Sequence, residues 1–264
     1  MMYVFLAFLF GLFIGSFLGV VINRFPRHES VFVGRSYCET CKHILAWYDL
    51  IPIFSYVYLK GKCHYCKTKL SLFYPLIELV TGFLFAIAVF IFITPLTLIN
   101  LRFLFYFFYL LAMISSFILI FFIDFKKGII PDSILIFDIV LILLWLSFNP
   151  LSVIVNHLLS GIGCLLFFVA VSYIFYLFTR KEGMGGGDVK LSFVLGLFFG
   201  FPGIFIALYL AFILGAIGAL FLIFLKKKKF QSALPFGPFL VAGSFLTLFF
   251  QSRLNYLFFK IFGL

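Results

Sequence analysis

The sequence predicts an all-helical protein that crosses a membrane about eight times and carries one small loop domain outside the bilayer. Of the 264 residues, 65% are hydrophobic and 11% are charged, and the mean hydropathy is +1.24. A soluble domain of this length does not bury so much apolar surface, so the composition indicates a polytopic membrane protein. The lengths of the apolar runs and the positions of the basic residues lead to the same fold class.

Eight apolar runs approach or exceed the length that crosses a bilayer, roughly 20 residues at about 1.5 Å each. The fourth and sixth are the shortest. No basic residue precedes the first run and no small-residue cleavage pattern follows it, so we interpret it as a retained span and not a signal peptide. The predicted spans are residues 3–23, 74–95, 102–124, 132–149, 153–178, 188–200, 203–225 and 235–260.

Lysine and arginine give the orientation of these spans, because cytosolic loops carry an excess of positive charge. With the N-terminus outside, four segments face the cytosol, and together they hold 17 of the 20 basic residues. This sorting accounts for the net charge of +11 without a nucleic-acid partner. The cytosolic segments are 24–73, 125–131, 179–190 and 226–234.

Residues 24–73 are long enough to form a domain outside the bilayer, but about 50 residues rarely build a sufficient apolar core alone. Such a small domain needs a cross-link or a bound metal ion, and two cysteine pairs, Cys38 with Cys41 and Cys63 with Cys66, can supply one. Their spacing is C-x2-C, 21 residues, C-x2-C, and two such turns offer four thiolates to one zinc ion. Two disulfides are the alternative, which a reducing cytosol disfavours.

A glycine-rich stretch before the sixth span, Gly185, Gly186 and Gly187, leads directly into Asp188. A carboxylate at a membrane boundary is costly and usually functional. Glycines leave a bare backbone that another chain can approach closely. These three glycines are therefore candidate substrate-binding residues, and Asp188 is a candidate for peptide-bond hydrolysis if a second carboxylate meets it.

Asp124 ends the third span at the same cytosolic edge as Asp188. Two carboxylates that share one proton can hydrolyse a peptide bond, because the ionised one activates water and the neutral one polarises the carbonyl. Other interpretations remain open at this point: Asp124 can pair with Lys126 or Lys127, and Asp188 can stabilise the start of a helix. Asp138, deeper in the fourth span, competes with Asp124 as the partner of Asp188.

Short motifs follow one another along nearly the whole chain. They are Gly15-Ser16-Phe17-Leu18, Arg24-Phe25-Pro26, the two cysteine pairs, Tyr74-Pro75-Leu76-Ile77-Glu78, Asp124 with Ile129-Ile130-Pro131-Asp132, Gly185-Gly186-Gly187-Asp188, and Phe236-Gly237-Pro238. In this order they resemble the type IV prepilin peptidases, a family of GxGD intramembrane aspartyl proteases.

The resemblance implies an eight-span enzyme of the bacterial inner membrane that cuts type IV prepilins, or pseudopilins of secretion or DNA-uptake machines, after a glycine on the cytosolic side. Asp124 and Asp188 match the family's catalytic pair, and the four cysteines match its zinc ligands. Many members also methylate the new N-terminus with S-adenosylmethionine, and Glu78 matches in the region given this role. Gly19 and Phe73 depart from the asparagine and arginine expected there.

The predicted domains are a first transmembrane helix (1–23), a cytosolic zinc loop domain with a methyltransferase role (24–73), and a transmembrane aspartyl peptidase domain (74–264). An ion-coupled transporter is the alternative from another class, with Glu78, Asp138 and Asp188 forming a proton path. Such a transporter has no use for a four-cysteine loop. A member of the family with peptidase activity alone, or another GxGD protease, is the nearer alternative.

Overall fold

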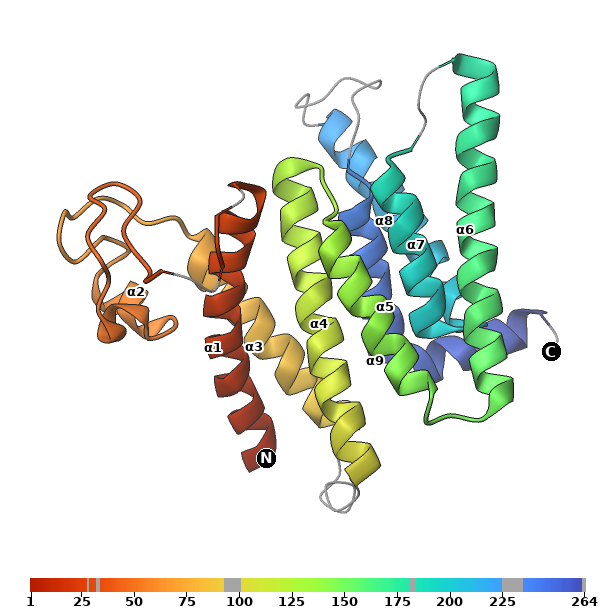
Figure 1. The fold of residues 1–264 in the computed structure, drawn as a ribbon, viewed down its shortest axis with the longest axis horizontal. Helices are drawn as coiled ribbons and strands as arrows, with labels where there is room; N and C mark the ends of the chain where they lie inside the picture. The colour runs from red at the N-terminus through yellow and green to blue at the C-terminus, as the bar shows by residue number, and fades with distance from the viewer. Residues whose placement is uncertain (28, 32–33, 93–100, 181–183, 225–234, 263–264) are drawn as a thin grey trace. The chain divides into compact units, whose positions relative to one another are not determined.

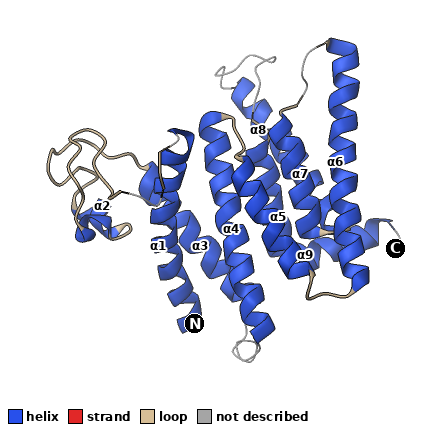
Figure 2. Ribbon diagram, viewed as in Figure 1, coloured by secondary structure: helices blue, strands red, loops and turns tan. Residues whose placement is uncertain are grey.

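A computed structural model describes the chain apart from residues 28, 32–33, 93–100, 181–183, 225–234 and 263–264 (Figure 1). The described residues are mainly helical (Figure 2), which confirms the all-helical prediction. The predicted cytosolic segment 226–234 lies outside the described residues.

Nine α-helices and two short 3-10 helices form in the described part of the chain. Five of the α-helices are long and apolar enough to cross a membrane. Within each of them the backbone amides and carbonyls bond inside the helix, as the lipid interior requires. The five are α1 (Met2–Arg24), α3 (Phe73–Phe92), α4 (Leu101–Lys127), α6 (Leu151–Thr179) and α8 (Gly203–Phe224).

The predicted count of eight spans is not confirmed. The fourth and sixth predicted spans form α5 (Asp132–Leu146) and α7 (Gly186–Phe199), which are shorter than the roughly 20 residues of a full crossing. The eighth forms α9 (Gly237–Phe262), which leaves helical geometry at Phe250, where φ is −112° and ψ is 16°. Figure 1 shows the C-terminal part of α9 turning away from the direction of its first part.

Two compact units make up the chain, Met1–Leu119 and Ile120–Leu264. The first holds α1, the cysteine loop, α3 and most of α4. The second holds the last residues of α4 and the helices α5 to α9.

In the first unit, α1 and α3 pack together along small residues. A Cβ atom on Gly11 would lie 2.8 Å from the Cα atom of Gly82, and one on Gly15 would lie 2.7 Å from the Cα atom of Glu78. Such close approach of two backbones is typical of helix pairs in membranes. The pair anchors the cysteine loop, because the loop leaves from the end of α1 and returns at the start of α3.

In the second unit, the short helix α7 has the most neighbours, since it packs against α5, α6, α8 and α9. A Cβ atom on Gly196 of α7 would lie 2.7 Å from the Cα atom of Gly161 in α6. Helices α8 and α9 meet equally closely, because a Cβ atom on Gly243 would lie 2.6 Å from the carbonyl oxygen of Ala207. Helix α7 is therefore held on several sides, and it carries Asp188 in its first turn.

Candidate active site and metal centre

Asp188 is the third residue of α7, whose N-cap is Gly185. A carboxylate in the first turn of a helix interacts favourably with the unpaired amides there. The three preceding glycines differ from one another. Gly186 has open space where a Cβ atom would lie, whereas a Cβ atom on Gly187 would lie 3.1 Å from Cβ of Ile130. Gly185 and Gly186 are exposed and accessible to another chain, and Gly187 is part of the packing.

Asp124 lies in the last turn of α4 and is 4% exposed. The helix ends three residues later at Lys127, and the amide of the next residue, Gly128, donates to the Asp124 carbonyl at 2.7 Å with a φ of +66° that suits glycine. Its side-chain oxygen Oδ2 is buried without a hydrogen-bond partner among the described residues. A buried carboxylate oxygen in this state is costly, so the site is arranged for something other than stability alone.

The structure brings Asp124 and Asp188 together within the second unit. Asp124 lies near enough for its charge to act on Asp188, and the backbone amide of Gly237 lies beside both carboxylates. The two aspartates come from α4 and α7, and Gly237 is the first residue of α9. Three helix ends thus meet at one pair of acids.

Gly237 is a site residue whose role the sequence alone does not reveal. A Cβ atom at this position would collide with Oδ2 of Asp124 and would lie 3.1 Å from Cδ1 of Ile130. Ile130 therefore packs against both Gly187 and Gly237 beside the acid pair. The available sequence signal is the Gly-Pro step at the start of the last predicted span, where a helix start and a close backbone approach are both expected.

The other acids of this unit lie elsewhere. Asp138 is fully buried in α5, six residues after the first residue of that helix. Asp132, the first residue of α5, forms an exposed ion pair with Lys190 of α7, with Nζ–O distances of 2.8 and 2.9 Å. This ion pair joins the helix starts that flank the site.

The four paired cysteines converge in the first unit. Their Sγ atoms all lie within 4.8 Å of one another, and those of Cys38 and Cys66 are 3.8 Å apart. A tetrahedral zinc site with bonds of about 2.3 Å has sulfur–sulfur edges of roughly 3.8 Å, so the four thiols fit a metal ion. They are free thiols and not disulfides. Hydrogen bonds from the Thr68 side chain and amide lower the pKa of Cys66 to about 6, which favours its thiolate.

The two cysteine turns share one construction. The Lys42 amide donates to the Cys38 carbonyl at 2.8 Å, and the Lys67 amide donates to the Cys63 carbonyl at 3.1 Å. Both lysines are in the left-handed region, with φ of 59° and 58°. Each chain segment therefore reverses directly after its second cysteine, which points both thiols of a pair to the same side.

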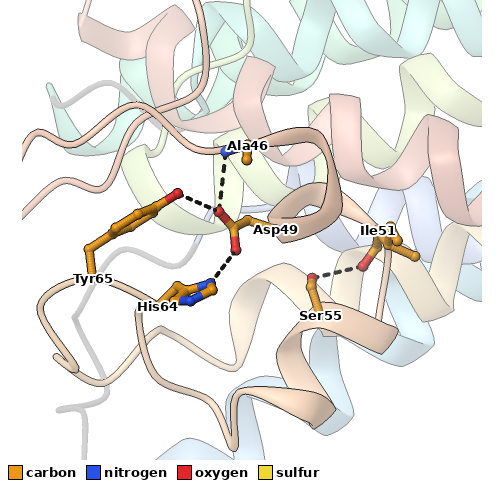
Figure 3. A network of polar contacts seen from close by, with 6 residues as sticks. All are labelled: Ala46, Asp49, Ile51, Ser55, His64 and Tyr65. Carbon is orange, nitrogen blue, oxygen red and sulfur yellow. Dashed lines mark hydrogen bonds and ion pairs between the residues drawn. The ribbon is translucent and has the colours of Figure 1, made fainter.

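A carboxylate supports the second cysteine turn (Figure 3). Asp49 accepts hydrogen bonds from the Ala46 amide at 3.1 Å and the Tyr65 hydroxyl at 3.3 Å, and its Oδ1 lies 3.1 Å from Nδ1 of His64. The Asp49 side chain is only 3% exposed. It lies in the 3-10 helix η2 (Trp47–Leu50), so this network ties η2 to the residues that follow Cys63.

Glu78 is buried in α3, at 7% exposure. It accepts a hydrogen bond from the Ile53 amide at 2.7 Å, and the Ser16 side chain of α1 lies near the carboxylate. The carboxylate therefore joins both helices of the first unit to the middle of the cysteine loop.

A separate open pocket of about 510 Å³ lies at the end of α1. It combines three cationic side chains with one carboxylate and one aromatic ring. Arg24 and Lys42 lie over the ring of Tyr37, at 5.8 and 5.1 Å from its centroid. Glu78 does not line it. The lining residues are Arg24, Glu29, Ser30, Gly34, Arg35, Tyr37, Lys42 and Ile44.

Two family profiles match the sequence. Residues 9–92 match the Bacterial Peptidase A24 N-terminal domain, and residues 111–220 match the Type IV leader peptidase family. A Prepilin leader peptidase/N-methyltransferase from Aeromonas salmonicida is 33% identical over 94% of this chain and 90% of the relative. The chain belongs to the type IV leader peptidase family. The resemblance found in the motifs is thereby confirmed, and so is the prediction of a peptidase.

Relatives with the same name come from distant bacteria. The one from Bacillus subtilis is 33% identical over 90% of this chain and 91% of the relative, and the one from Vibrio cholerae is 30% identical over 96% and 98%. No solved structure matches the chain. The four paired cysteines lie in the residues that match the N-terminal domain, and Asp124 and Asp188 lie in the residues that match the leader peptidase family.

Proposed function

We propose that this chain is a prepilin leader peptidase, an intramembrane aspartic endopeptidase whose catalytic pair is Asp124 and Asp188. The observation that carries the proposal is their meeting at the amide of Gly237, although they are 64 residues apart in the sequence. Like charges held this close in a buried site do not both ionise readily, so the pair shares a proton. A shared proton is the state that aspartic proteolysis requires.

In the proposed reaction, the ionised member of the pair takes a proton from water as the oxygen of that water attacks the peptide carbonyl carbon. The neutral member gives its proton to the carbonyl oxygen. Breakdown of the tetrahedral intermediate cleaves the C–N bond. The departing nitrogen takes a proton from one aspartate, and a hydroxyl group of the intermediate gives its proton to the other, which restores the pair with one shared proton. The acids titrate together, so neither has a fixed role.

The proposed substrates are type IV prepilins or pseudopilins, cut after the leader's glycine on the cytosolic side. The names of the relatives support this class of substrate. Gly185 and Gly186 are exposed, and Asp188 follows within one turn. An extended peptide can therefore lie along the backbone of these glycines, with Gly187 held in place by Ile130.

For location, we propose the bacterial inner membrane with the acid pair at its cytosolic face. The placement of the basic residues supports this orientation. The proposed eight crossings are the five long helices together with α5, α7 and α9. The proposed domains remain 1–23, 24–73 and 74–264, in which the first two serve the cysteine loop and the third serves proteolysis.

We further propose that Cys38, Cys41, Cys63 and Cys66 hold a structural zinc ion. Four thiolates leave no open coordination position, so the ion supplies folding energy to the loop and takes no part in hydrolysis. The proposed methyl donor is S-adenosylmethionine, which supplies an electrophilic methyl group. Its carboxylate and ammonium suit the pocket at the end of α1, where Arg35 and Glu29 offer the opposite charges. Glu78 serves this activity by holding the loop.

The mass of the processed pilin tests the methyltransferase proposal. With S-adenosylmethionine present, we expect the mature N-terminus to gain one methyl group, measured by intact-protein mass spectrometry. Arg35→Ala is expected to lower methylation by about tenfold and to leave cleavage unchanged, because it removes a cation from the pocket and not from the acid pair. Lys69→Ala, an exposed lysine outside the pocket, is the matched control. A wild-type product without the methyl mass would make this chain a peptidase only.

Replacing Gly237 tests the geometry of the acid pair. Gly237→Ala is expected to slow prepilin cleavage by about 100-fold, because the new methyl group takes the space of Asp124 Oδ2 and moves that carboxylate. The rate is measured in membranes that contain equal amounts of each variant. Gly163→Ala is the control, since a Cβ atom there meets open space. A Gly237→Ala enzyme with the wild-type rate would show that the position of Asp124 does not depend on the close approach of Gly237.

A further inference from the structure

The cysteine loop exposes a set of large apolar side chains between its two cysteine pairs. We call residues 47–58 the aromatic segment; it comprises η2 and α2 (Phe54–Tyr58). Exposed apolar groups at this density mark an interaction surface. They are Trp47 (76% exposed), Tyr58 (76%), Val57 (67%), Phe54 (64%), Tyr48 (46%) and Leu50 (39%).

Internal hydrogen bonds give this segment a defined shape (Figure 3). Asp49 binds the amide of Ala46, and the Ser55 hydroxyl donates to the carbonyl of Ile51 at 2.8 Å. The rings also pair with one another, since the centroids of Phe54 and Tyr58 are 6.2 Å apart in a stacked arrangement. These polar groups therefore bond within the loop, whereas the apolar side chains are exposed on its surface.

The bond between Ile53 and Glu78 places the aromatic segment level with the interior of two spanning helices. Glu78 lies five residues after the start of α3, a rise of about 7.5 Å along the helix. The other partner of this carboxylate, Ser16, lies eight residues before the end of α1, which is about 12 Å. In the view of Figure 1, α2 lies at a level between the two ends of α1.

The charges around the aromatic segment fit an anionic surface. Lys60, Lys62, Lys67 and Lys69 follow it and are exposed, whereas the carboxylate of Asp49 is turned inward. Tryptophan and tyrosine concentrate at the membrane–water boundary, and lysine side chains reach from there to lipid phosphates. Clustered lysines beside a span attract anionic headgroups.

We propose that the aromatic segment is embedded in the interfacial layer of the bilayer, in the leaflet where α1 ends, with an anionic lipid surface as its partner. The rings of Trp47, Phe54 and Tyr58 lie among the headgroups and upper acyl chains, and the four lysines meet lipid phosphates. The cysteine loop is then fixed to the membrane surface at a third place besides α1 and α3. This inference is independent of the proposed peptidase and methyltransferase activities.

Tryptophan fluorescence tests the proposal directly, because the chain has two tryptophans, Trp47 and Trp145. The full-length Trp145→Phe protein is placed in vesicles of phosphatidylcholine with a quarter phosphatidylglycerol, made with acyl chains brominated at different depths. Trp47 emission is expected to fall about twofold with bromines near the headgroup and less with bromines near the chain end. If the Trp145→Phe protein does not accumulate, the emission of Trp47 is obtained by subtracting the emission of the Trp47→Phe protein from that of the wild type.

Two results would overturn the proposal. If acrylamide quenches the fluorescence of Trp47 and no brominated lipid does so, Trp47 is exposed to water. If neither reagent quenches this fluorescence, Trp47 is covered by protein, such as a second copy of the chain or a substrate.

The lysines are tested by replacing all four with glutamine. We expect this variant to lose the additional quenching that phosphatidylglycerol gives over phosphatidylcholine alone, and equal quenching in both lipids for the wild type would refute the anionic partner.

Discussion

Asp124→Asn and Asp188→Asn are each expected to abolish prepilin cleavage, with a loss of about 1,000-fold or more. An amide cannot take a proton from the attacking water, and it cannot share a proton with the remaining carboxylate. The loss should appear in membranes that hold the same amount of folded enzyme. The measurement is the fraction of a prepilin substrate converted to its shorter mature form over time.

Two other acids of the same unit serve as controls for this prediction. Asp132→Asn removes only an exposed ion pair with Lys190, which contributes little in solvent, so cleavage is expected to continue. Asp138→Asn is also expected to remain active, because Asp138 lies six residues inside α5, whereas Asp124 and Asp188 lie at the ends of their helices. If Asp124→Asn cleaves normally and Asp138→Asn is folded but inactive, the catalytic partner of Asp188 is Asp138 and not Asp124.

Loss of the metal centre is expected to be the largest effect on stability. Replacing the four paired cysteines with serine should remove all bound zinc, and the loop loses a contribution of about 10 kcal/mol or more. The loop should then become sensitive to added protease, and the yield of the protein should fall. Metal content is measured by mass spectrometry on purified protein. Because zinc requires thiolates, the amount bound should also fall as the pH is lowered.

Cys164→Ser provides the matched control for the metal prediction. This cysteine is buried in α6, in the other unit of the chain from the four clustered thiols. Its replacement should leave one zinc per protein and an intact loop. Stoichiometric zinc in the variant that lacks all four paired cysteines would refute the proposed centre.

The local features of this protein could be predicted from the sequence. The spacing of the cysteine pairs places four thiols together because each pair lies in one tight turn, and the structure confirms the cluster. The long apolar runs predict the five spanning helices for the same local reason. The pairing of Asp124 with Asp188 needed the family resemblance, because charge and depth alone left Asp138 as a competing partner; in the structure the charge on Asp124 acts on Asp188.

Features that depend on distant contacts could not be predicted. The part of Gly237 in holding both acids follows from the packing of α9 beside α4 and α7, which no motif spacing encodes. The bend at Phe250 divides a run that looks continuous in hydropathy. The hydrogen bond from the Ile53 amide to Glu78, which joins the cysteine loop to α3, depends on tertiary packing in the same way.

The contact between Gly196 and Gly161 determines which substitutions this protein tolerates. It lies eight residues along α7 from Asp188, at the far end of the same short helix. An added methyl group there would push α7 away from α6 as a rigid body, because the two backbones already touch. The carboxylate would move with its helix, while Asp124 belongs to another helix and would stay. An alanine far from any acid can therefore be as harmful to this enzyme as one beside the acids.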